Sequence, residues 1–155
     1  MKVENVVIDA AGCSLGRLAA YSAKAALDGK KVVIFNAEAA VISGKGDRIF
    51  EDYKRMYDAK SQANPKRFGP KRPRNPDRFV RRTIRGMLPW KTARGKAAFK
   101  RVMVYSGKPE KEIKRKDHID ISKAQLADVA YMKRYYDLSV TVAELCESLG
   151  GSNGS

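Results

Sequence analysis

The apolar residues in the first third of the chain follow two alternating patterns. Short β-branched runs at 6–10 and 32–37 have the length and composition of buried strands. Between them, small and aliphatic residues recur at helical spacing from Leu15 to Ala26, and Gly29 follows as a stop. A strand, a helix and a strand joined by short connections predict a parallel βαβ crossover.

Three further segments extend this pattern. Residues 101–107 (RVMVYSG) have the composition of another core strand, and 41–46 (VISGKG) begins like a short one. Between Ile49 and Tyr57, apolar and aromatic residues recur at the spacing of an amphipathic helix. We therefore expect an α/β fold whose small open sheet has three strands, or four if 41–46 joins it, and is covered by helices.

The C-terminal third has balanced charge. The stretch 108–121 is rich in both signs, and we interpret it as exposed. Thr141 and Glu144 have the spacing of a capping box, which predicts a helix over 142–149 that Gly150 ends. We expect residues 1–149 to form a single domain and 150–155 to form a flexible tail.

The net charge of +15 changes the picture because it is concentrated in one segment. Between Lys60 and Arg101 there are 15 Lys or Arg residues and one acid, Asp77, which gives a local charge of +14. The other 113 residues contain 17 bases and 16 acids. Uncompensated like charges destabilise a compact state, and a polyanion relieves that repulsion. The basic block at 60–101 therefore predicts nucleic acid as the partner, ahead of an acidic membrane or an acidic protein.

The basic block begins with a proline-rich segment at 64–76 (NPKRFGPKRPRNP). Four prolines and a glycine in thirteen residues exclude a regular helix or a central strand. We expect an extended loop that becomes ordered on binding RNA. Together with the helix that follows, it would form a basic loop–helix extension of the α/β domain.

A helix is predicted from Asn75, which suits the N-cap, with Pro76 at its first position and Asp77 at its positive end. At about 100° per residue, its apolar side chains share one face. The members of that face are Phe79, Val80, Thr83, Ile84, Met87 and Leu88. The opposite face has four arginines with no glutamate among them: Arg78, Arg81, Arg82 and Arg85. This arginine stripe indicates phosphate binding, because each guanidinium can bind a phosphate bidentately.

We expect shape and charge, more than base identity, to determine RNA recognition. Small residues in the segment 91–101 would allow close backbone approach to RNA. Phe68 and Trp90 are candidates for stacking on unpaired bases, whereas we assign Phe99 to the core. The predicted RNA-binding set is Lys45, Lys60, Lys66, Arg67, Lys71, Arg72, Arg74, Arg78, Arg81, Arg82, Arg85, Lys91, Arg94, Lys96, Lys100 and Arg101.

Catalytic and metal-binding chemistry has little support in the sequence. The single histidine, His118, has no nucleophile motif beside it, and the usual zinc and hydrolase signatures are missing. We interpret Cys13 and Cys146 as buried thiols in a reducing cytosol. No run is apolar enough for a membrane span, and the first residues do not resemble a secretory signal. We expect a cytoplasmic protein that is not an enzyme and has no cofactor, metal or small-molecule substrate.

Two other functions stay open. The turn at 12–17 (GCSLGR) lies between a strand and a helix, which is the setting for phosphate binding at a helix N-terminus. Its spacing matches neither a P-loop nor GxGxxG, so a nucleotide-binding enzyme is the weaker alternative. Regulation of particular messenger RNAs is the second alternative, and the sequence does not test it.

Four segments together resemble the large-subunit ribosomal protein thirteen family in its archaeal form. They are IDAAGCSLGRLAA at 8–20, VVIFNAEAAVISGKG at 32–46, FEDYKR at 50–55 and VRRTIRGMLPWKTARGKAAFKRVMVYSGKP at 80–109. The run RGMLPWK at 85–91 is the most specific of these landmarks. The resemblance implies a three-layer α/β/α domain with a four-stranded parallel sheet. It also implies binding to large-subunit ribosomal RNA beside neighbouring ribosomal proteins, and an early role in subunit assembly, with 85–89 matching the RNA-contacting motif.

Overall fold

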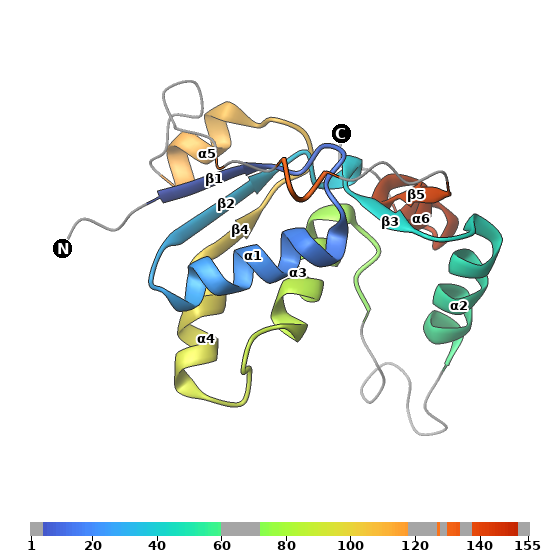
Figure 1. The fold of residues 1–155 in the computed structure, drawn as a ribbon, viewed down its shortest axis with the longest axis horizontal. Helices are drawn as coiled ribbons and strands as arrows, with labels where there is room; N and C mark the ends of the chain where they lie inside the picture. Colours follow the sequence, from blue (N-terminus) through green and yellow to red (C-terminus); the bar gives the residue numbers. More distant parts are fainter. Residues whose placement is uncertain (1–4, 60–71, 118–126, 128–129, 134–137, 152–155) are drawn as a thin grey trace.

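The computed structural model shows a mixed α/β protein (Figure 1). It describes residues 5–59, 72–117, 127, 130–133 and 138–151, and every structural statement below concerns these residues. The central sheet consists of β1 (Asn5–Asp9), β2 (Lys31–Phe35) and β4 (Val102–Val104), in the order β1-β2-β4. Both strand pairs are parallel.

Helix α1 (Leu15–Leu27) connects β1 to β2 and confirms the predicted βαβ crossover. It ends where the sequence indicates: Asp28 is the C-cap, and Gly29 adopts the left-handed backbone with a φ of 94° that favours glycine. The buried residues of α1 are mostly alanines and leucines. These small side chains let the helix lie close to the sheet and to its neighbouring helices.

Alternate residues of the strands are buried against different layers. Ile8, Val32 and Ile34 belong to the main core together with α1, α3 (Pro76–Gly86) and α4 (Ala93–Lys100). Val7, Val33, Phe35 and Tyr105 form a second cluster with Ile113, which lies on α5 (Glu110–Asp117). Burial on both sides is typical of a parallel sheet. The sheet is therefore the middle layer, with α5 on one face and α1, α3 and α4 on the other.

The fourth parallel strand is not confirmed. The segment at 41–46 does provide a strand, β3 (Val41–Ser43), but this strand pairs antiparallel with β5 (Ser139–Thr141) in a separate two-stranded sheet. The chain turns away from the parallel sheet directly after β2, where Asn36 has a left-handed φ of 55° and a short 3-10 helix follows at Ala37–Ala39. Helix α2 (Gly46–Asp58) then begins beside the small sheet.

The capping box at the C-terminal helix is confirmed. The Glu144 backbone N–H donates to Thr141 Oγ1, and the Thr141 N–H donates to Glu144 Oε2, at the start of α6 (Val142–Ser148). Gly150 follows with a φ of 75°. Both thiols, on Cys13 and Cys146, are free and buried, as the sequence predicted. None of the helices that the structure describes is long and apolar enough to cross a membrane.

Two helices were not predicted. The segment at 91–101 forms α4, and most of the charged segment after Lys108 forms α5 with Ile113 fully buried. Neither segment has an apolar stripe that repeats over several turns, because each is only eight residues long. Helices this short depend on tertiary packing for their stability, so periodicity alone does not reveal them.

Candidate nucleic-acid interface

Helix α3 forms from a favourable start and an apolar face that packs into the core. Asn75 occupies the N-cap, although its side chain makes no capping hydrogen bond, and Pro76 is the first helical residue. Phe79, Val80 and Ile84 are buried, as is Leu88 just beyond the helix. Met87 departs from the predicted apolar face and is 43% exposed, because the helix ends before it.

The four arginines of the stripe lie around one groove. This arginine groove has a volume of about 390 Å³, and the described residues that line it are Arg72, Pro73, Arg78, Arg81, Arg82, Arg85 and Phe99. They provide five guanidinium groups and no carboxylate. The stripe predicted from the sequence is thus joined by Arg72 from the preceding segment and by an aromatic side chain from α4. An anion in the groove would meet positive charge from several directions.

Aromatic rings hold two of these arginines in place. The guanidinium carbon of Arg81 lies 4.7 Å from the centre of the Phe99 ring, and that of Arg85 lies 4.2 Å from the centre of the Trp90 ring. The two rings contact each other edge to face, with centroids 5.1 Å apart and an interplanar angle of 88°. Stacked guanidinium groups keep their edges available for hydrogen bonding. The pair therefore orients arginine donors before a ligand binds.

Within the part of the chain that the structure describes, two guanidinium nitrogens beside the groove are buried without a hydrogen-bond partner. They are Nη1 of Arg72 and Nε of Arg81. Leaving a charged donor unsatisfied costs more than leaving a neutral one, so such atoms call for an acceptor. Both residues also line the groove, where a phosphate could bind the accessible edges of their guanidinium groups and neutralise the clustered charge.

Helix α2 contacts the segment that contains Arg72 and Pro73 and holds it at one side of the arginine groove. Tyr57 donates a hydrogen bond from its hydroxyl to the backbone oxygen of Pro73, and its ring lies 5.8 Å from the guanidinium carbon of Arg72. Tyr53 packs on Phe79 with ring centroids 5.6 Å apart. Burial raises the pKa of the Tyr57 hydroxyl, which keeps this donor protonated. From the sequence, Tyr57 was predicted only to lie on the apolar face of a helix. Its hydrogen bond to Pro73 was not predicted, because the two residues are 16 positions apart.

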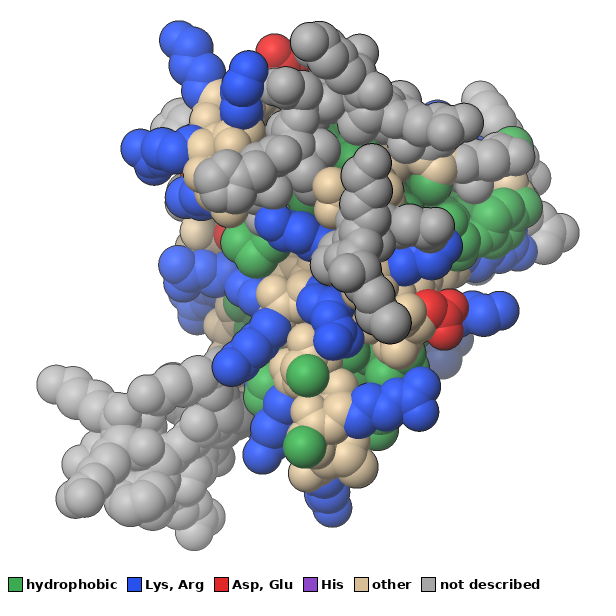
Figure 2. Space-filling model, turned by 90° about the vertical axis from the view of Figure 1, so that its left-hand side faces the viewer, with side chains coloured by type: hydrophobic (Ala, Val, Ile, Leu, Met, Phe, Trp, Pro, Cys, Tyr) green, Lys and Arg blue, Asp and Glu red, His purple; other side chains and the backbone are tan. Residues whose placement is uncertain are grey.

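The other predicted RNA-binding residues differ in their placement. Lys60, Lys66, Arg67, Phe68 and Lys71 lie outside the described residues. Five more are exposed: Arg74, Lys91, Arg94, Lys96 and Lys100. Figure 2 looks at the side of the molecule where α4 and the end of α1 lie, and Lys and Arg side chains clearly outnumber acidic ones there.

Two predicted residues lie apart from the groove. Arg101 is half-buried and donates a hydrogen bond from Nη1 to the backbone oxygen of Ala26, 3.2 Å away, so its guanidinium helps to end α1. Lys45 is exposed at the start of α2, roughly 18 Å along the helix from Tyr57. Neither residue is among the described residues that line the arginine groove.

Small residues in the segment 91–101 were expected to allow close approach to RNA. In the structure, one of them allows a close approach between two parts of the protein itself. A β-carbon on Gly95 would lie 2.1 Å from the backbone oxygen of Pro89, so only glycine fits at this position. Thr92 caps α4 by accepting a hydrogen bond from the Gly95 N–H at 3.1 Å. Gly95 therefore sets how closely α4 packs on the turn that carries Trp90.

The glycine turn at 12–17 does not offer the donors of a phosphate-binding loop. The backbone N–H groups of Gly12, Cys13 and Ser14 already donate to the backbone oxygens of Ala39, Ala10 and Met132, each at 3.0 Å. A phosphate cradle needs several such groups pointing into open space. These three groups are therefore unavailable to a nucleotide phosphate.

Comparison with known proteins adds to this geometry. The family model described as "Ribosomal protein L13" matches residues 4–111. A protein of Methanocaldococcus jannaschii is 55% identical over 104 residues, which cover 67% of this chain and 76% of the relative. Proteins of Archaeoglobus fulgidus (44% identity; 93% and 86% covered) and Sulfolobus acidocaldarius (43% identity; 96% and 95% covered) match nearly end to end. All three are named "Large ribosomal subunit protein uL13".

Proposed function

Because the chain belongs to the ribosomal protein L13 family, we propose that it is a structural constituent of the large ribosomal subunit. In this role it binds large-subunit ribosomal RNA through the basic block at 60–101 and supports an early step of subunit assembly. The α/β core serves as a scaffold that presents the arginine groove. The protein acts by binding, on the ribosome and beside other large-subunit proteins, and catalyses no reaction.

The arginine groove is the observation that supports this proposal most strongly. Its five guanidinium groups, with no carboxylate among the described residues that line the groove, favour an anionic ligand. The stripe extends from Arg78 to Arg85, roughly 10 Å along α3, which is longer than one phosphate group. A polymer of phosphates fits this length better than a single phosphate ion does. Most protein contacts to a nucleic-acid backbone fix position and orientation, which suits a structural role.

The mode of recognition follows from the chemistry of the groove. Arginines read the spacing and direction of phosphates, whereas base edges in the deep groove of an RNA helix are out of reach for side chains. We therefore expect the groove to recognise the shape of folded RNA.

The test compares two variants that lose the same amount of charge. The stripe variant carries Arg78→Ser, Arg81→Ser, Arg82→Ser and Arg85→Ser. The control variant carries Arg48→Ser, Lys54→Ser, Arg55→Ser and Lys111→Ser at exposed positions on α2 and α5. Affinity for purified large-subunit ribosomal RNA is measured at several salt concentrations, and incorporation into large subunits is measured by co-sedimentation.

We expect the affinity of the unmodified protein to fall steeply with salt, since each neutralised phosphate contributes about 0.7–0.9 to the log–log slope. The stripe variant should have a slope smaller by up to about 3–4 and should be poorly incorporated, while the control changes little. A flat salt response, or equal losses in both variants, would contradict the phosphate-binding role. Circular dichroism checks that the stripe variant is folded; its unfolding would show that the four arginines are needed for the fold.

An early role in assembly predicts a particular order of events. In a pulse-labelling time course, the protein should appear in the first large-subunit precursors, and its depletion should leave precursors without the proteins that bind later. Appearance only in nearly complete subunits would refute the early role but leave the structural role intact.

A further inference from the structure

A second groove runs along the outer side of α1, outside the basic block. It has a volume of about 630 Å³ and extends over roughly 16 Å of the helix. The side chains that give it its chemistry are Arg17, Tyr21, Lys24, Asp28, Lys30 and Tyr131. We refer to it as the α1 groove. It shares no lining residue with the arginine groove.

The aromatic wall of the α1 groove is held in place by contacts with α1 and the turn before it. Arg17 donates a hydrogen bond from Nη1 to the backbone oxygen of Tyr131 at 3.3 Å, and the Ser14 N–H donates to the backbone oxygen of Met132 at 3.0 Å. The Tyr21 and Tyr131 rings meet edge to face with centroids 6.1 Å apart and an interplanar angle of 68°. Tyr131 nevertheless leaves 56% of its surface exposed. The groove thus presents a supported aromatic ring to solvent.

The charge of the groove selects the kind of ligand. Among the described residues, three cations and a single carboxylate line it, so a negatively charged ligand is favoured. Cations that follow a groove, together with an exposed aromatic ring, are the combination with which proteins bind single-stranded nucleic acid. The bases of a duplex are stacked inside it and cannot reach Tyr131, whereas an unpaired base can. An acidic protein segment would match the charge but would make less use of the ring.

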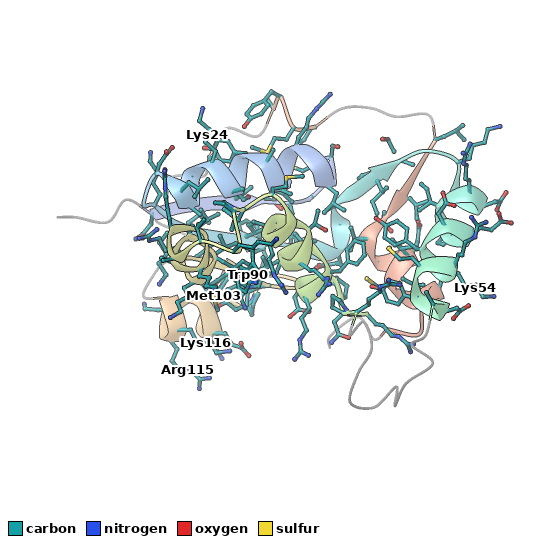
Figure 3. All side chains as sticks on the ribbon, turned by 90° about the horizontal axis from the view of Figure 1, so that it is seen from below. Lys24, Lys54, Trp90, Met103, Arg115 and Lys116 are labelled. Carbon is teal, nitrogen blue, oxygen red and sulfur yellow. The ribbon has the colours of Figure 1, made fainter. Side chains whose placement is uncertain are left out.

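We propose that the α1 groove binds a single-stranded segment of RNA, with an unpaired base against Tyr131 and backbone phosphates near Arg17, Lys24 and Lys30. This inference rests on the proposed role in the large subunit and adds a second contact to it. Lys24 projects from the outer face of α1, on the opposite side of the molecule from Arg115 and Lys116 of α5 (Figure 3). Since no described residue lines both grooves, RNA bound in the two grooves would contact the protein at two separate sites.

The experiment uses the full chain and purified large-subunit ribosomal RNA. Hydroxyl-radical footprints and affinities are compared for the unmodified protein, the stripe variant and two sets of α1-groove variants. One set tests stacking: Tyr131→Leu removes the aromatic ring, and Tyr131→Phe keeps it. The other tests charge with Lys24→Ser, a change at an exposed position that leaves the tyrosine pair untouched. Thermal unfolding checks that each variant is folded.

We expect Tyr131→Leu to weaken binding at least fivefold and to remove the protection of one short unpaired stretch of RNA. Tyr131→Phe should keep that protection, Lys24→Ser should weaken it, and the stripe variant should lose a different set of nucleotides. If Tyr131→Leu and Lys24→Ser leave footprint and affinity unchanged while the unmodified protein binds, the α1-groove inference is wrong and the proposed function stands. If the unmodified protein does not bind the RNA, the proposed function itself fails. Loss of a neighbouring protein from subunits containing Tyr131→Leu, with an unchanged footprint, would overturn the inference in favour of a protein ligand.

Discussion

The guanidinium of Arg85 lies over the ring of Trp90, with its central carbon 4.2 Å from the ring centre. The two residues are the first and sixth of the run RGMLPWK, which ends α3 and leads into α4. Backbone hydrogen bonds close this turn: Leu88 donates to Arg85 and Trp90 donates to Leu88, at 3.2 and 2.7 Å. The most specific sequence landmark is thus a compact turn that places an aromatic ring under an arginine of the arginine groove.

This relationship predicts a limited role for Trp90 in RNA binding. Trp90→Leu should weaken binding to large-subunit ribosomal RNA about two- to fivefold, because a cation–π contact at a partly exposed site is worth about 0.5–1 kcal/mol. Affinity titrations measure this loss, and Trp90→Phe, which keeps an aromatic ring, should recover part of it. A loss of fiftyfold or more, with strong quenching of the only tryptophan in the unmodified protein, would instead indicate that a base stacks on Trp90.

Gly95 gives a prediction about stability. Gly95→Ala should destabilise the protein by about 1–3 kcal/mol, because its β-carbon would lie 2.1 Å from the Pro89 backbone oxygen and would push α4 away from the turn. Urea unfolding measures the change. Gly16→Ala is the matched control, since Gly16 also lies near the start of a helix but a β-carbon there meets nothing within 4 Å. We expect the control to be neutral or stabilising by up to about 0.5 kcal/mol. Equal behaviour of the two variants would show that α4 can move at no cost.

Cys146 gives a prediction about thiol reactivity and about how the free energy of unfolding depends on pH. Burial raises the pKa of its thiol to about 12 from an ordinary value of 9.0, with a smaller contribution from Asp77. The thiol should therefore stay protonated and unreactive in the folded protein at pH 8, and react with a thiol reagent only after unfolding. In the unfolded chain the thiol ionises above about pH 9, whereas in the folded chain it does not. Ionisation of this thiol should thus leave the free energy of unfolding unaffected below pH 9 and should decrease it as the pH rises from 9 towards 12.

A variant isolates the contribution of this thiol. Burial also raises the pKa of Tyr53 and Tyr57, and their ionisation in the unfolded chain acts in the same direction above about pH 10. Cys146→Ala should show a shallower decrease than the unmodified protein between pH 9 and 10, measured by urea unfolding. Identical pH profiles for the two proteins would mean that Cys146 is accessible to solvent.

The sequence predicted best where the determinants of structure are local. The helix at 15–27, its glycine stop and the capping box at Thr141 each depend on residues within a few positions of one another. The arginine stripe was predicted for the same reason, since a helix of known period places Arg78, Arg81, Arg82 and Arg85 on one side. The crossover from 6–10 to 32–37 was also predictable, because short connections leave few alternative topologies.

Tertiary structure decided what depends on partners distant in the sequence. A three-residue strand such as β3 pairs with whichever strand lies beside it, so its antiparallel pairing with β5, about 100 residues later, was not encoded near residue 41. Likewise, Arg101 was included among the predicted RNA-binding residues on its charge alone. Only the folded structure brings its guanidinium to the backbone oxygen of Ala26, to which it donates a hydrogen bond. The α1 groove was missed because its cations are mixed with acids along the chain and its exposed tyrosine comes from residue 131. By itself, the sequence determined that the chain would form α/β layers and that its positive charge would be concentrated in one block, from which RNA binding was predicted. Packing decided which Lys and Arg residues face a common groove and which help to hold the fold together. Side chains distant in sequence become neighbours only in the folded protein.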